Sequence, residues 1–126
     1  MRPVKVAIAD ERGELAACSE GVPTFHVGVR TDVMEFTPKA AAIRSLIRSM
    51  SPEVIITDEI GGEEDAEAVA EAARCGAAVI ASVHAGSAEE LLSRRAVAGI
   101  VGSGAFKRVL MLRRNGSVLR VFPVKL

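Results

Sequence analysis

The sequence predicts an α/β fold in which mostly parallel central strands alternate with helices and an antiparallel β-hairpin follows. Short runs rich in β-branched residues recur along the chain, and each is apolar almost throughout, as is typical of strands buried on both faces. These runs occupy residues 4–9, 54–57 and 77–83. Helical periodicity lies between the runs, and an Asn-Gly pair between two later β-rich runs indicates the hairpin.

A first helix is expected between the first two runs, where Thr37 can act as the N-cap and Pro38 suits the first helical position. Pro52 should end this helix. Its apolar residues follow the i, i+3, i+4, i+7 spacing of one buried face. They are Ile43, Leu46, Ile47 and Met50.

A second helix is expected after Gly61 and Gly62, with an acidic first turn and small side chains that suit close packing against a sheet. Its stripe consists of Ala66, Val69, Ala70 and Ala73. Gly76 suits a left-handed conformation at the end of this helix. Ser87 with Glu90 predicts a capping box at the start of a third helix.

Two segments lack such periodicity. Residues 13–37 form a connection much longer than the usual length of about 4 to 6 residues, so we expect a functional loop with a short strand within 25–30. The glycine-rich residues 98–106 are expected to form a second loop. The hairpin follows, and its β-rich runs are 107–113 and 117–122.

Composition limits the classes of partner. The 126 residues suffice for one domain, and 16 basic against 16 acidic residues leave no broad basic surface for nucleic acid or anionic membrane. The aromatic residues are four Phe, too few for a base-stacking surface. Without a membrane-length apolar run, a signal-peptide pattern or a disulfide framework, the chain is expected to be cytoplasmic.

Ionisable residues follow all three predicted core strands. Asp10 and Glu11 follow the first, Asp58 and Glu59 the second, and His84 the third. Any one acidic pair in such a place more often begins a loop or caps a helix. Because the carboxyl ends of parallel strands share one edge of a sheet, where ligands bind, the three endings together predict a functional site.

The segment SPEVIITDEIGG has the sequence pattern of a Walker B strand, which presents a carboxylate to nucleotide-bound magnesium. Asp58 would hold the metal, and Glu59 would act as general base toward the attacking water. The phosphate-binding pattern G-x-x-x-x-G-K-[ST] does not occur in the chain. The residues therefore predict only part of a nucleotide site.

Two further side chains are candidates for phosphate chemistry. His84 either senses a γ-phosphate or positions water, or else it hydrogen-bonds the first turn of the next helix. Arg30 lies in the long loop and is a candidate for reaching a phosphate or a neighbouring subunit's site. The adjacent arginine pairs nearer the C-terminal end are expected on solvated surface.

Several stretches, in order, carry a family resemblance: ADERGELAAC, GVPTFHVGVRTDV, TPKAAAIRSLIRSMSPEVIITDEIGGEEDAEAVAEA and AAVIASVHAGSAEELLSR. They resemble the stage III sporulation protein AA family, a branch of the secretion ATPases. The resemblance implies a RecA-like, P-loop NTPase-type, three-layer α/β fragment. Residues 1–126 would form a single domain, the C-terminal part of the ATPase core, with the Walker B segment and the histidine box but without Walker A.

Carried over residue by residue, the resemblance implies an acidic box after the first strand, a Walker B pair after the second and a histidine box after the third. The expected catalytic groups are Glu11, Glu59 and His84, and the expected metal ligand is Asp58. The expected cofactor-binding residues are Asp10 and Arg30.

The family is expected to hydrolyse ATP with magnesium, as a hexameric ring in the mother-cell cytoplasm, for the channel to the forespore. Its expected partners are further copies of itself and other sporulation channel proteins, through which it associates peripherally with the membrane. Because the phosphate loop is missing, this chain alone is expected to be nearly inactive as an ATPase.

Two other functions stay open from the sequence. A receiver-like phosphoacceptor signalling domain has this length and places acids and a lysine where Asp10, Glu11, Asp58 and Lys107 stand. The long loop and the hairpin in place of a final helix argue against it. A non-catalytic remnant would instead associate with other chains through an exposed sheet edge.

Overall fold

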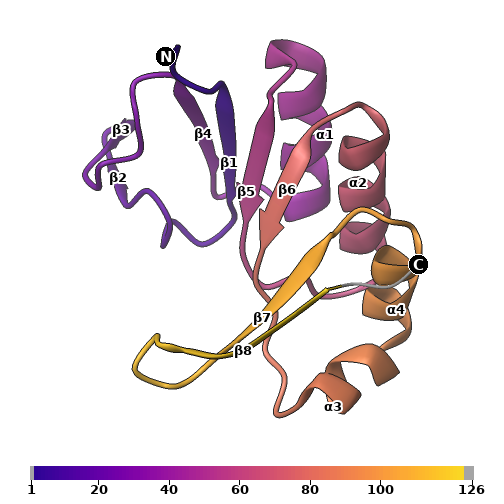
Figure 1. The fold of residues 1–126 in the computed structure, drawn as a ribbon. Helices are drawn as coiled ribbons and strands as arrows, with labels where there is room; N and C mark the ends of the chain where they lie inside the picture. Colours follow the sequence, from indigo (N-terminus) through magenta and orange to yellow (C-terminus); the bar gives the residue numbers. More distant parts are fainter. Residues whose placement is uncertain (1, 124–126) are drawn as a thin grey trace.

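The computed structural model describes residues 2–123, and a four-stranded parallel sheet lies at its centre (Figure 1). The strands are β1 (Val6–Asp10), β4 (Thr31–Glu35), β5 (Val54–Thr57) and β6 (Ala78–Ala81), in the spatial order β4-β1-β5-β6. Every neighbouring pair runs parallel. The predicted α/β fold with parallel central strands is confirmed, and each expected apolar run overlaps a strand.

Helices α1 (Lys39–Met50) and α2 (Glu63–Arg74) pack side by side against this sheet (Figure 1). The core between them consists of small and branched side chains, so the helices approach the strands closely. Its residues without solvent exposure are Ala7, Ala9, Ala42, Ile43, Ile55, Ala68, Val69 and Ala72. This shared core fixes where the ends of the strands lie.

The strand β6 departs from the expected burial on both faces. Val79 and Ala81 pack against the core, so alternation along the strand turns Ile80 to the opposite face. There Ile80 is 59% exposed. The sequence run is continuously apolar, but β6 is an edge strand, and its residues on that face, Ala78 and Ile80, are exposed.

The helix α1 begins one residue later than predicted. Pro38 occupies the N-cap position, and the side chain of Thr37 donates a hydrogen bond to the Glu35 carbonyl oxygen (3.3 Å) instead of capping the helix. In α2, Gly76 has the predicted left-handed backbone (φ +90°) directly after the helix. The apolar stripes are confirmed in outline, with Ala70 and Ala73 only half-buried.

Two short helices follow β6. Ser87 caps α3 (Ala88–Ser93) as predicted, because its Oγ accepts the backbone N–H of Glu90 (3.0 Å). The Glu90 carboxylate accepts the N–H of Gly86. The loop predicted for residues 98–106 is wrong over its first half, because α4 (Arg95–Gly102) extends to Gly102 and packs on α2 through buried side chains.

The long segment after β1 contains the antiparallel pair β2 (Cys18–Ser19) and β3 (Val22–Pro23). The strand expected within residues 25–30 is wrong: that stretch is irregular, and β4 begins immediately after it. Gly28 has a positive φ of +102°, which breaks an extended conformation there.

The buried carboxylate of Asp10 organises the first turn of this segment. Oδ1 accepts the backbone N–H groups of Glu14 (2.9 Å) and Leu15 (3.1 Å), and Oδ2 accepts that of Ala16 (2.9 Å). Asp10 has no solvent exposure, so these bonds replace its hydration. The last residue of β1 thereby fixes the path of the loop that follows.

The predicted C-terminal hairpin is confirmed. Strands β7 (Arg108–Leu112) and β8 (Val118–Pro123) pair with each other and with neither of the other sheets. In Figure 1 the turn of the hairpin lies well away from the helices. Among residues 2–123, no helix has the length and apolarity required to cross a membrane.

We predict that Asp10→Asn lowers the free energy of unfolding by about 2–3 kcal/mol, because asparagine keeps one acceptor oxygen and places N–H donors against backbone donors. Urea unfolding followed by circular dichroism measures this change. Asp32→Asn, on the exposed side of β4, is the matched control and should change stability little. Equal losses in the two variants would contradict the assigned role.

Candidate functional site

The carboxyl ends of β1 and β5 and the first turns of α1 and α2 enclose a cleft of 310 Å³. Its lining residues are Glu11, Arg12, Lys39, Asp58, Glu59, Gly61 and Asp65. The sequence-predicted residues Glu11, Asp58 and Glu59 therefore lie together at one site. Four carboxylates and two cations face the cleft, so it is negative overall.

Asp58 presents an unengaged carboxylate to this cleft. The residue is 9% exposed, and its carboxylate has no hydrogen bond or ion pair with any described residue. The preceding Thr57 donates a buried hydrogen bond to the Ala9 carbonyl oxygen (3.0 Å), which ties the end of β5 to β1. The end of β5 thus positions Asp58 at the cleft, while its oxygen atoms remain available to a ligand.

Glu59 has a backbone conformation that is uncommon for a residue with a side chain. Its φ is +42°, in the left-handed region. The Glu59 N–H donates to the Ser82 Oγ (3.1 Å), and the Glu59 carbonyl oxygen accepts from the Lys39 Nζ (2.8 Å). Both backbone groups are therefore held by side chains from other elements, which stabilises the strained conformation.

The carboxylate of Glu59 is held by two neighbours. It forms an ion pair with Arg12, and its Oε1 lies 3.3 Å from the Nε2 of His84. The hydrogen bond from Arg12 is the main reason why the pKa of Glu59 is lowered, and His84 acts in the same direction. Glu59 is consequently ionised at neutral pH, and it is a weaker base than a free glutamate.

Lys39 is the principal site residue that the sequence analysis missed. Its side chain is 4% exposed, and Nζ lies 3.4 Å from the Glu11 Oε2 and 3.9 Å from the Asp65 Oδ2. One signal could have revealed it: Lys39 stands four residues before Ile43, on the buried stripe of α1. A cation in the first turn of a helix also opposes the helix dipole, so a special reason for it was to be expected.

Arg12 and Ser82 were also missed. Ser82 lies within the predicted run 77–83, but β6 ends at Ala81, so Ser82 falls at the same edge of the sheet as the predicted residues. Arg12 follows Glu11 directly and its charge made it a candidate for pairing with acidic neighbours.

The remaining predicted residues lie in three different places. His84 stands at the rim of the cleft with a largely exposed side chain. Asp10 is buried at the end of β1, with both oxygen atoms occupied by backbone N–H groups. Arg30 is not brought to the cleft: its guanidinium donates to the Pro3 carbonyl oxygen (3.0 Å), at the amino end of the sheet.

The donor set fits a magnesium ion only in part. Within residues 2–123, no group of three or more His, Cys, Asp or Glu side chains is arranged to hold a metal. Magnesium in nucleotide sites is commonly bound by one or two carboxylates together with substrate phosphates and water. The free carboxylate of Asp58 suits that role, whereas the cations of the cleft are already paired with protein oxygens.

Comparisons with known proteins agree with the fold and identify the family. The family model described as "Sporulation stage III, protein AA" matches residues 1–124. Stage III sporulation protein AA of Bacillus subtilis (strain 168) is 46% identical over 125 residues, which cover 97% of this chain and 41% of that protein. This chain thus spans less than half of that relative's length.

A solved structure shows the same architecture. The Legionella pneumophila ATPase DotB superposes with a TM-score of 0.59 at 15% sequence identity, over 91% of this chain and 35% of DotB. At this identity the likeness concerns the fold alone. On the match to the family model and on the identity with the Bacillus protein, this chain belongs to the sporulation stage III protein AA family.

Proposed function

We propose that this chain supplies the metal-side and water-side carboxylates of a sporulation ATPase. The observation that carries the proposal is the pair Asp58-Glu59 at the carboxyl end of β5, where Asp58 faces a cleft with an unengaged carboxylate. Family membership and the likeness in fold to the ATPase DotB support it. The receiver alternative gains no such support, and Lys107 is not among the residues that line the cleft.

In the proposed site the two carboxylates have separate tasks. Asp58 would hold the magnesium of bound ATP, which would supply positive charge to the phosphates. Glu59 orients the attacking water and accepts its proton at a carboxylate oxygen. His84, 3.3 Å from the Glu59 carboxylate, steadies that group from the rim of the cleft.

The groups that bind phosphate are proposed to come from the part of the family protein that this chain does not span. The phosphate-loop pattern is absent from the 126 residues. Lys39 bonds the Glu59 carbonyl oxygen and Arg12 pairs with the Glu59 carboxylate, so neither cation is free for a phosphate. Residues of this chain therefore complete a nucleotide site without forming one alone.

Membership of the family supports a proposal for the biological role. We place the complete protein in the mother-cell cytoplasm, where ATP hydrolysis by a ring of copies powers assembly or transport at the channel to the forespore. Other channel proteins would connect it to the membrane. The chain's membership of a sporulation family supports this assignment.

A first prediction from the proposed function concerns nucleotide binding. Isothermal titration of ATP with magnesium into the 126-residue chain should give a Kd above about 1 mM, because no phosphate cradle is present. The complete Bacillus subtilis protein is the positive control. Micromolar binding by the chain alone would contradict the division of the site.

The second prediction concerns the proposed base. In the Bacillus subtilis protein, glutamine at the position of Glu59 should lower ATP turnover by roughly 10²- to 10⁴-fold while ATP binding is retained. Glutamine at the position of Glu89, an exposed residue of α3, is the matched control and should leave turnover unchanged. If turnover survives the Glu59 change, the base lies elsewhere.

The third prediction concerns the ion pair that holds the base. Arg12→Gln should raise the pKa of Glu59 toward its ordinary value, because the main group that stabilises the ionised carboxylate is removed. A pH titration of the side-chain carboxyl carbons by NMR measures this pKa, and Glu59→Gln assigns the signal. Arg48→Gln, on the exposed face of α1, should leave the titration unchanged.

A further inference from the structure

The charges of the chain are divided sharply along the sequence. All 16 acidic residues lie within residues 1–90, together with eight of the 16 basic residues. Residues 91–126 contain the other eight basic residues and no acidic one. A chain with zero net charge therefore carries a strongly acidic body and a strongly basic C-terminal segment.

The hairpin β7–β8 combines this positive charge with exposed apolar surface. Five of its aliphatic side chains are between 47% and 59% exposed: Leu110, Leu112, Val118, Leu119 and Val121. Lys107, Arg108, Arg113 and Arg114 form no ion pair with a carboxylate of the described residues. An isolated two-stranded hairpin is only marginally stable in water. Exposed apolar surface next to positive charge therefore indicates that the hairpin binds a partner.

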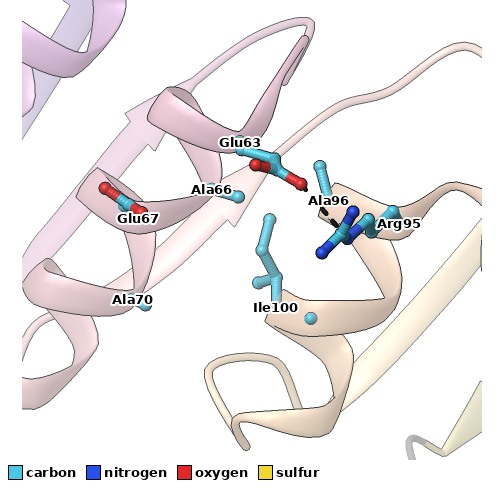
Figure 2. Close-up of a pocket in the computed structure, with 8 residues that line it drawn as sticks. Glu63, Ala66, Glu67, Ala70, Arg95, Ala96 and Ile100 are labelled. Carbon is cyan, nitrogen blue, oxygen red and sulfur yellow. Dashed lines mark ion pairs between the residues drawn. The ribbon is translucent and has the colours of Figure 1, made fainter.

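A groove between α2 and α4 has an apolar lining and acidic side chains, which complement the apolar and basic hairpin (Figure 2). Its volume is 380 Å³, and its apolar lining comes from Ala66, Ala70, Ala96, Gly99 and Ile100. Figure 2 shows the ion pair of Glu63 with Arg95 (3.4 Å) at this groove. Glu67 also lines it, and Glu64 lies on the adjacent exposed surface of α2.

The described part of the hairpin leaves this groove open. No residue of β7 or β8 is among the residues that line it, so the chain's own hairpin does not fill it. Glu64 and Glu67 form no ion pair within the part of the chain that the structure describes. An apolar groove with unpaired carboxylates suits a ligand that is apolar and basic.

We propose that the hairpin of one copy docks in the α2–α4 groove of a second copy. Leucine side chains such as Leu110 and Leu112 would enter the groove, and hairpin arginines would pair with Glu64 and Glu67. The acidic body favours another copy over an anionic lipid surface, because an acidic body is repelled by anionic headgroups. The inference rests on the self-association proposed above, and it is independent of ATP hydrolysis.

This contact joins two different surfaces of the same chain. Each copy offers one hairpin and one groove, so the contact is heterologous and generates either a closed ring or an open chain of subunits. Its charged rim predicts that association weakens as salt rises.

Sedimentation velocity on the 126-residue chain tests the proposal. The wild-type chain should self-associate, and its apparent Kd should rise at least roughly tenfold between about 0.05 and 0.5 M salt. The hairpin variant Leu110→Ser/Leu112→Ser and the groove variant Glu64→Lys/Glu67→Lys should each be monomeric alone. Mixed together they should form a 1:1 dimer, because one retains an intact groove and the other an intact hairpin.

Controls separate this contact from general effects on folding. Leu92→Ser, an exposed leucine of α3, and Glu89→Lys should associate as the wild type does. A wild-type chain that stays monomeric at low salt, or variants that fail to form the mixed dimer, would overturn the proposal. Hairpin-dependent binding of a monomeric chain to vesicles with phosphatidylserine would assign the hairpin to lipid and would also overturn it.

Discussion

The buried ammonium group of Lys39 holds the carboxyl edge of the sheet together. It bonds the Glu59 carbonyl oxygen and lies close to the carboxylates of Glu11 and Asp65, so one cation links α1 to the segments after β1 and β5 and to α2. A buried charge is tolerated only when oppositely charged or polar groups surround it. The convergence of these segments, and with it the shape of the cleft, therefore depends on this one group.

The two central carboxylates of this cleft differ in how they are bonded to the rest of the chain. The Asp58 carboxylate has no hydrogen bond or ion pair among the described residues, whereas Glu59 is held by its backbone and by Arg12. A hard cation needs an available oxygen, and a water-orienting group needs a fixed direction. Asp58 meets the first requirement because its oxygen atoms are available, and Glu59 meets the second because its carboxylate is held in place. This difference is the physical basis of the two roles proposed for them.

The sequence was sufficient for the sheet and for the position of Asp58, because apolar runs and strand ends are local patterns. The sequence was not sufficient to locate the Lys39 ammonium group, since its partners come from three separate segments. Glycines made the start of the segment 98–106 look irregular, but burial of α4 against α2 outweighs their low helix propensity. The sequence could not show that Arg30 lies away from the cleft of its own chain, because the loop returns to the amino end of the sheet.

The central place of β1 bears on how the chain reaches this fold. Val6 is in register with Thr31 on one side and with Val54 on the other. The first strand of the chain therefore pairs with its neighbours only after segments distant in the sequence have come close to it. Such non-local pairings require loop closure before they contribute stability, and they slow folding. The hairpin β7–β8 closes over a short turn and needs no such search. Folding speed should therefore be limited by the placement of β1, whose last residue, Asp10, also orders the loop that leads to β4.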